Sequence, residues 1–206
     1  MRGGRALREE EAAVEFIPDS ISTPLDFSLI FQRAAALEID LGCGDGQFLL
    51  ARAQEFPARN FLGIERLSGR ARSFCRKMAR AGLTNARVLR IETSCAVQHL
   101  VPAASVTLFH LLFPDPWPKR RHQHRRSFNE SLMRALHRAL VPDGQLHIAT
   151  DHVDYFQHID NLLIGDPFFR RVENIPAFPG TAFEEKFLER GLPIYRLLLE
   201  KNSTPD

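Results

Sequence analysis

The chain of 206 residues has little cysteine and no long hydrophobic run. Its three cysteines, Cys43, Cys75 and Cys95, form no C-x-x-C pair, so the pattern favours neither a disulfide framework nor a zinc ribbon. Glutamates 9–11 stand where a signal peptide would need its apolar core, and the apolar stretches fall below the roughly 18 residues of a membrane-spanning helix. We therefore expect a soluble cytoplasmic protein that is neither secreted nor membrane-bound.

Low-complexity character is also absent, because only 12 glycines and 13 prolines are spread over the chain. The fractions of hydrophobic residues, 44%, and of charged residues, 25%, are usual for a globular protein, and the length suits one domain with a full core. We expect residues 24–201 to form that domain. Residues 1–23 are expected to be a loosely ordered N-terminal extension, and residues 202–206 a tail.

The net charge is only +2, but the charged residues are segregated along the chain. From Arg66 to Arg126 there are thirteen Lys or Arg and only two acids, Glu92 and Asp115. Segregation of this kind predicts one positive face, which is typical of proteins that bind a polyanion such as nucleic acid. A solvated surface without a partner is the alternative.

Short apolar runs alternate with stretches of helical periodicity from residue 37 onward. The runs predict strands at residues 37–41, 60–65, 87–91, 106–113, 145–150, 168–173 and 194–201. The periodicities predict helices at about 46–56, 67–81, 94–100, 127–140 and 153–164. This alternation predicts an α/β fold with a doubly wound, mostly parallel, seven-stranded Rossmann-like sheet and helices on both faces.

A glycine-rich turn follows the first predicted strand and leads into a helix. Glycines at Gly42, Gly44 and Gly46 allow a sharp turn and keep Cβ atoms away from a bound cofactor. Such a turn can also be a packing device, and its spacing differs from the dinucleotide fingerprint G-x-G-x-x-G. The turn alone is therefore weak evidence for a cofactor site.

Acids near the ends of the first three predicted strands strengthen that evidence. Asp40 lies two residues before the first glycine, Glu65 closes the second strand, and Glu92 follows the third. In a doubly wound sheet, an acid at the end of the second strand can accept hydrogen bonds from ribose hydroxyls. A carboxylate at Glu92 can receive an adenine amino group, although a surface acid is the alternative for Glu65. The combination resembles the class I S-adenosylmethionine methyltransferases, which implies that cofactor.

A proline-rich turn, Phe113-Pro114-Asp115-Pro116-Trp117-Pro118, follows the fourth predicted strand. Its three prolines stiffen the turn and hold Asp115 and Trp117 at the carboxyl edge of the sheet. Asp115 can accept hydrogen bonds from a guanine or oppose a positive charge, and Trp117 offers a stacking plane. A stiff structural turn with a buried tryptophan is the alternative.

A basic run at residues 119–126 comes directly after this turn, with five cations and two histidines. This density of cations predicts contacts with the phosphates of a nucleic acid. The two histidines, His122 and His124, do not predict a metal site, because the sequence offers no third ligand nearby and the surrounding charge is positive. We expect no bound metal.

Three separate motifs resemble the bacterial tRNA (guanine-N7-)-methyltransferase family. They are FPDPWPKRRH at residues 113–122, ATD at 149–151, and T-x-F-E-x-K-F with G-x-P-I-Y-R at 181–196. The resemblance runs from about residue 24 to residue 200. It implies transfer of the methyl group of S-adenosylmethionine to N7 of the variable-loop guanosine of tRNA, with no obligate protein partner evident.

The resemblance also implies roles for particular residues. It implies cofactor contacts from Asp40, Glu65, Glu92 and Asp115, and substrate contacts from Lys119, Asp151, Thr181 and Glu184. For two of these residues a purely structural role is the alternative: Asp151 can be a helix N-cap, and Glu184 can form a surface ion pair with Lys186.

Guanine N7 carries a lone pair and no proton, so methyl transfer to it needs no general base. Orientation and exclusion of water are expected to dominate the rate. A carboxylate close to the purine, Asp115 or Asp151, helps as positive charge moves onto the base, and Asp115 is the predicted catalytic residue. The competing hypotheses are methylation of an exocyclic base amine, since Asp115-Pro116-Trp117 is similar to the turn of such enzymes, and a non-catalytic RNA-binding module of the same fold.

Overall fold

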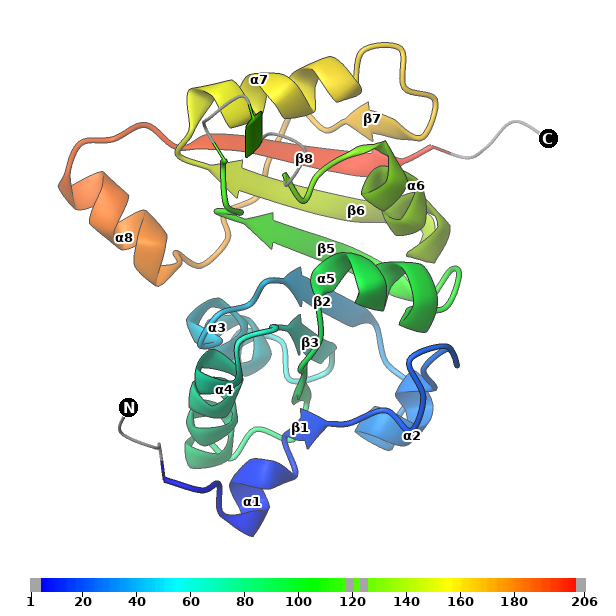
Figure 1. Cartoon of the computed structure of the whole chain (residues 1–206), viewed down its shortest axis with the longest axis vertical. Coiled ribbons are helices and arrows are strands. Elements are labelled where there is room, and N and C mark those ends of the chain that lie inside the picture. Colours follow the sequence, from blue (N-terminus) through cyan, green and yellow to red (C-terminus); the bar gives the residue numbers. More distant parts are fainter. Residues whose placement is uncertain (1–4, 118–120, 123–125, 203–206) are drawn as a thin grey trace.

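The computed structural model describes residues 5–117, 121–122 and 126–202. These residues form an eight-stranded sheet in the order β1-β4-β3-β2-β5-β6-β8-β7, which runs from the bottom of the view in Figure 1 to the top. The strands are β1 (Glu15–Phe16), β2 (Leu37–Leu41), β3 (Asn60–Ile64), β4 (Ala86–Leu89), β5 (Val106–Leu112), β6 (Leu140–Thr150), β7 (Phe169–Arg171) and β8 (Tyr195–Lys201).

The pairing of the strands creates a crevice near the middle of the sheet. Strands β1 to β6 pair in parallel, whereas β8 pairs antiparallel with both β6 and β7. The chain moves outward from β2 through β3 to β4 and then crosses to β5 on the other side of β2. This reversal of direction between β2 and β5 is the place where ligands bind in open α/β sheets.

Helices cover both faces of the sheet, as predicted. They are α1 (Glu9–Ala12), α2 (Phe27–Phe31), α3 (Gln47–Glu55), α4 (Ser68–Arg80), α5 (Thr93–Cys95), the π-helix η1 (Ala96–Leu100), α6 (Glu130–Ala139), α7 (Val153–Leu162) and α8 (Ala182–Glu189). One apolar core lies under α3 and α4 and includes Phe48, Phe61 and Phe74. A larger core lies under η1, α6 and α7 and includes Leu136 and Tyr155.

All seven predicted strands are present, and the sequence missed an eighth. Strand β1 pairs with β4 through Glu15 opposite Val88 and Phe16 opposite Leu89. The expectation of loose order is therefore wrong for this part of residues 1–23. The segment is ordered because two of its side chains are buried. Val14 packs into the core under α4, and the carboxylate of Glu11 in α1 is buried against Arg5. The domain boundary at residue 24 stays a prediction.

Strand β6 begins five residues earlier than the expected start at residue 145. Residues 142–144, Pro-Asp-Gly, lie inside this strand as an irregularity, with Asp143 in the left-handed region at φ 58°. The pairing of β5 with β6 shifts register at the same place, between Val106 and Leu108. Among the helices of the described residues, none is long and apolar enough to span a membrane.

Candidate active site

The glycine-rich turn connects β2 to α3 and presents its backbone to the crevice. Gly42 and Gly44 have positive φ angles of 84° and 58°, and a Cβ atom on either would point into open space. Gly46 is different, because a Cβ atom there would lie 2.2 Å from the ring of Phe74 on α4. The structure therefore makes Gly42 and Gly44 fit a ligand-facing role, whereas Gly46 serves the packing of α4 against the turn.

Glu65, directly after β3, fixes this turn in place. Its Oε2 accepts a hydrogen bond from the backbone N–H of Gly44 at 3.1 Å, and its Oε1 accepts one from the N–H of Leu67 at 2.7 Å. The side chain is only about 5% exposed, and the guanidinium of Arg70 lies beside it, with its Nη1 4.0 Å from Oε2. A carboxylate has about four lone-pair sites, so Glu65 can accept further hydrogen bonds from a ligand.

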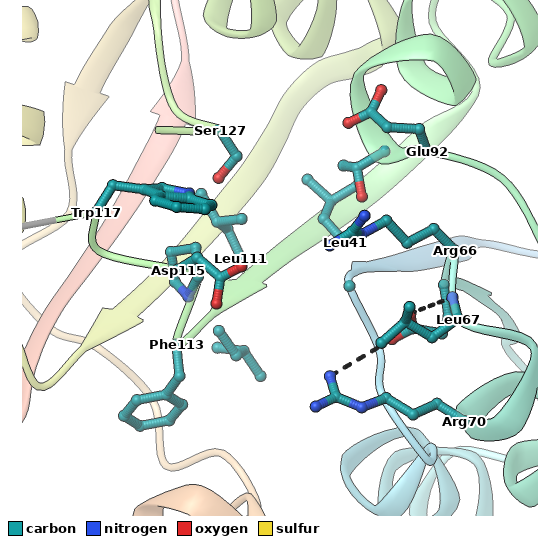
Figure 2. A pocket seen from close by; sticks show the side chains of 15 residues that line it. Leu41, Arg66, Leu67, Arg70, Glu92, Leu111, Phe113, Asp115, Trp117 and Ser127 are labelled. Atoms are coloured by element: carbon teal, nitrogen blue, oxygen red, sulfur yellow. Dashed lines mark hydrogen bonds and ion pairs between the residues drawn. The ribbon is translucent and has the colours of Figure 1, made fainter. Parts of the chain in front are cut away.

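A cavity of about 440 Å³ opens beside Glu65 at the carboxyl ends of the strands. Figure 2 shows Phe113, Asp115 and Trp117 on one side of it and Glu92, Arg66 and Arg70 on the other. The remaining lining residues are Leu41, Gly42, Glu65, Leu67, Thr93, Leu111, Leu112, Pro114 and Ser127. Glu65, Glu92 and Asp115 thus meet at one cavity, with apolar side chains from β2 and β5 forming part of its wall.

Glu92 is exposed at the rim and has a structural role as well. Its Oε2 accepts a hydrogen bond from the N–H of Cys95 at 2.9 Å and caps α5. Capping fixes the carboxylate in one orientation while the other oxygen, Oε1, makes no hydrogen bond within the described residues. The predicted contact with an adenine amino group is compatible with this geometry and stays a prediction.

A second cavity, of about 650 Å³, adjoins the first. The two share six lining residues: Gly42, Arg70, Leu112, Phe113, Pro114 and Asp115. The second cavity alone is lined by Asp40, Asp151, Thr181, Lys186 and Phe187, among others. Asp115 therefore lies where the two cavities meet, so a group bound in one can reach a group bound in the other.

Asp40 lines the second cavity from the end of β2. It is 3% exposed, and burial, followed by the charge of Glu65, raises the pKa of its carboxyl from 3.8 to about 7. A positively charged ligand group nearby would restore the ionised form, since opposite charges favour ionisation. This chemistry fits a cofactor that carries a cation.

The proline-rich turn after β5 is held in an uncommon conformation. Phe113 and Trp117 have positive φ angles of 49° and 41°, a region that side-chain-bearing residues rarely adopt. Between them Asp115 is exposed to the cavities, and the ring of Phe113 lies 5.6 Å from that of Phe187 on α8. The turn therefore presents a carboxylate and an aromatic ring to the same space.

The expected substrate residues fall into three groups. Asp151 and Thr181 line the second cavity, whereas Glu184 lines neither cavity within the described part of the chain and forms an ion pair with Arg196 on β8. The alternative for Asp151 as an N-cap is wrong, because His152 is the N-cap residue of α7. Lys119 lies outside the described residues.

No helix was predicted at the position of α8, although this helix brings Lys186 and Phe187 to the second cavity. A signal was present: Thr181-x-x-Glu184 is the pattern of a capping box, and the Oγ1 of Thr181 does accept a hydrogen bond from the N–H of Glu184 at 3.0 Å. Glu184 pairs with Arg196, and the surface pair of Glu184 with Lys186 stays a prediction. Arg70 and Ser127 are further lining residues that no motif indicated.

The cations between Arg66 and Arg126 are not all available to a partner. Arg66, Arg72 and Arg80 are exposed on or beside α4, whereas Lys77 pairs with Asp45 and Arg90 pairs with Glu15. The expectation of a phosphate contact is wrong for Arg126, because its guanidinium is buried and its Nε donates to the backbone oxygen of Pro116 at 3.0 Å. No cluster of three or more metal-binding side chains occurs in the described ranges.

Comparisons with known proteins identify the family of the chain. A family model described as "Putative methyltransferase" matches residues 34–197. The tRNA (guanine-N(7)-)-methyltransferase of Chlorobium phaeobacteroides is 38% identical and aligns over 82% of this chain and 83% of its own length. The protein of that name from Leifsonia xyli is 36% identical over 96% of this chain and 92% of its own length.

Solved structures share the fold at low sequence identity. An antibiotic-related methyltransferase superposes with a TM-score of 0.61 at 15% identity and covers 92% of this chain and 97% of its own. An rRNA methylase from Streptococcus thermophilus gives a TM-score of 0.57 at 12% identity, over 82% of this chain and 88% of its own. With the family model matching most of the chain and relatives above 30% identity, this chain belongs to the tRNA (guanine-N7-)-methyltransferase family.

Proposed function

We propose that this protein transfers the methyl group of S-adenosylmethionine to N7 of the variable-loop guanosine of tRNA. It does so in the cytoplasm, without a metal ion or an obligate protein partner. The observation that carries the proposal is the junction of two cavities at Asp115, one rimmed by Glu65 and Glu92 and the other by Asp151 and Thr181. A transferase needs such a junction, because donor and acceptor must meet at one point.

The first cavity suits the nucleoside part of the donor. Glu65 accepts hydrogen bonds from ribose hydroxyls, Glu92 accepts one from the adenine amino group, and the bare backbone of Gly42 and Gly44 leaves room for the rest. Asp40, with its raised pKa, and Asp115 face the positively charged end of the donor. S-adenosylmethionine supplies a methyl group on a positively charged sulfur, and the protein has to bind it and exclude water.

The second cavity suits a guanine base that has left its stack in the RNA. The rings of Phe113 and Phe187 offer faces for the base, and Asp151 can accept hydrogen bonds from its N–H groups. N7 needs no base because it carries no proton, so alignment of N7 with the donor accounts for the rate. Asp115 stabilises the positive charge as it moves from the donor to the purine.

The proposal is tested by incubating the purified protein with an unmodified tRNA transcript and methyl-labelled S-adenosylmethionine. We expect one labelled methyl group per tRNA, at a position where reduction with borohydride followed by aniline cleaves the chain, because N7 methylation makes the imidazole ring of the base reducible and the reduced base is then lost. A transcript with 7-deazaguanosine at that position is the control, since it has carbon in place of N7, and it should take up no label.

Two outcomes would contradict the proposal. Label that persists on the 7-deazaguanosine transcript, without cleavage by borohydride and aniline at the labelled position, would indicate methylation of an exocyclic amine. Binding of tRNA without any transfer of label, together with no cofactor binding in calorimetry, would indicate a non-catalytic RNA-binding module.

A further inference from the structure

Arg126 lies buried between the proline-rich turn and helix α7. Only 5% of its surface is exposed, its Nε donates a hydrogen bond to the backbone oxygen of Pro116 at 3.0 Å, and its guanidinium carbon lies 5.1 Å from the centre of the Tyr155 ring. Pro116 directly follows Asp115, and Tyr155 lies in the first turn of α7, four residues after Asp151. Arg126 therefore connects the two segments that bring carboxylates to the cavities.

The α7 side of this connection is firmly held. The Tyr155 ring is fully buried, and its hydroxyl accepts a hydrogen bond from the N–H of Phe128 at 3.1 Å and lies 3.2 Å from the Oγ of Ser127. His158, one turn further along α7, is hydrogen-bonded to the backbone oxygen of Phe128 at 3.2 Å. Ser127 also lines the first cavity, so the cluster around Tyr155 is continuous with the cofactor side of the site.

The proline-rich turn, on the other side of Arg126, needs contacts from outside the turn to fix its conformation. Two of its residues, Phe113 and Trp117, have the uncommon positive φ angles, and such conformations persist only where the surroundings enforce them. Its prolines have no backbone N–H, so the turn has few donors with which to fix itself. The N–H of Phe113 donates to the oxygen of Ala149 at 2.8 Å and holds the start of the turn, and Arg126 holds it at Pro116.

We propose that Arg126 is a positioning residue that clamps the turn of Asp115 to helix α7. The clamp sets the position of Asp115 relative to Asp151 and so relative to the base in the second cavity; this inference rests on the proposed function. The guanidinium is only 5% exposed, so its burial keeps it from an RNA phosphate, although its Nη2 has no hydrogen-bond partner within the described residues. Arg126 thus differs from the exposed cations of the basic run.

The test compares Arg126→Gln and Arg126→Lys with the parent protein. For each, the single-turnover rate of methyl transfer is measured at saturating tRNA and S-adenosylmethionine, and tRNA affinity is measured over a series of salt concentrations. We expect Arg126→Gln to lower the rate at least tenfold and to leave the slope of log affinity against log salt unchanged. Arg126→Lys should recover part of the rate, since lysine can still donate to Pro116.

Arg33→Gln is the matched control. Arg33 also donates hydrogen bonds to backbone oxygens, those of Pro57 at 2.9 Å and Arg59 at 2.6 Å. It lies just before β2, however, and so at the amino ends of the parallel strands, whereas the cavities are at their carboxyl ends. Its removal should lower the melting temperature and leave the single-turnover rate of the folded protein unchanged. Arg126→Met, which keeps the length of the side chain and removes its hydrogen-bond donors and charge, tests the same clamp if Arg126→Gln does not fold, and it should also slow transfer at an unchanged salt slope.

The proposal is overturned if Arg126→Gln transfers the methyl group at the parent rate. It is also overturned if the rate falls together with a salt slope that is smaller by about one, because this is the signature of a lost phosphate contact. An equal loss of rate in Arg33→Gln would overturn it in favour of general destabilisation. Failure of the proposed function is distinguishable, because the parent protein itself would then leave the tRNA without N7 methylation.

Discussion

The carboxyl group of Asp40 is buried close enough to the carboxylate of Glu65 for the two to repel each other, and both belong to the site. Burial first, and then the charge of Glu65, raise the pKa of Asp40 from 3.8 to about 7. A pKa that is raised in the folded state contributes stability that is present below about pH 4 and is lost as the pH rises through about 7. The site therefore holds a carboxylate at a cost to stability near neutral pH.

Asp40→Asn should for this reason be more stable than the parent at pH 8, and the difference should shrink toward pH 5. The change between the two pH values should be about 3 kcal/mol, because about two pH units separate pH 5 from the raised pKa, at roughly 1.4 kcal/mol per unit. Urea unfolding at both pH values measures it. Asp19→Asn, which changes an exposed acid, is the control and should show no such pH dependence. A pH-independent difference for Asp40→Asn would contradict the raised pKa.

Glu65→Gln should weaken cofactor binding more than Glu92→Gln does. Glu65 is buried and its two oxygens accept hydrogen bonds from the turn, so a glutamine amide would place an N–H group against an N–H donor. Loss of hydrogen bonds to a charged group costs roughly 1.5–3 kcal/mol, or about 10- to 150-fold in affinity. Glu92 is exposed, and a glutamine oxygen can still cap α5. Calorimetric titration with S-adenosylmethionine measures both, and equal losses would contradict the ranking.

Asp115→Asn should lower turnover by about 100-fold or more, in the range seen when one group that stabilises transition-state charge is removed. Asparagine keeps the size of the side chain and removes its charge. The side chain of Asp115 is exposed at the junction of the cavities, so folding should be unaffected. Measurement of kcat with tRNA and of cofactor affinity separates the two effects. A loss confined to cofactor affinity would assign Asp115 to binding rather than to the transfer step.

Lys119→Ala should weaken tRNA binding and reduce the slope of log affinity against log salt by about one, because each phosphate contact releases about one counterion. Turnover of tRNA that is already bound should fall little. Filter binding of tRNA at several salt concentrations measures the slope. Equal slopes for the variant and the parent would reject the phosphate contact at Lys119.

The core of the fold, and the meeting of acids at the carboxyl ends of the strands, could be predicted from sequence because both depend on local patterns, while the roles of those acids stay predictions. Apolar runs marked every strand from β2 onward, and the acids near the ends of β2 and β3 and after β4 followed from the order of a doubly wound sheet. Strand β1 is two residues long and has no pattern of its own, so only its pairing with β4 reveals it. Likewise the sequence of the basic run shows the charge of Arg126, whereas its burial against Tyr155 depends on α7, which lies about 30 residues away.

Glu38 is the central carboxylate of a buried ionic network that no sequence pattern indicated. It is on β2, is fully buried, and accepts hydrogen bonds from Arg52 at 2.7 Å and from Arg59 at 2.7 Å, with His110 at 3.1 Å. Burial alone would raise its pKa, but the hydrogen bond and charge interaction with His110, the charge of Arg52 and the hydrogen bond from Arg59 outweigh burial and lower the pKa from 4.5 to about 2. A depressed pKa gives stability that is present above about pH 4.5 and is lost as the pH falls through about 2.

Glu38→Gln should lower the free energy of unfolding by about 3–5 kcal/mol at pH 7, because it leaves the buried guanidinium of Arg52 without its counter-charge. The double variant with Arg52→Met should recover part of the loss, since no unpaired charge then stays buried. Glu55→Gln is the control: Glu55 contacts the same guanidinium at 3.7 Å but is exposed, so its loss should cost less than about 1 kcal/mol. Urea unfolding of the three variants measures the differences. If Glu38→Gln and Glu55→Gln cost the same, the buried network does not stabilise the fold in this way.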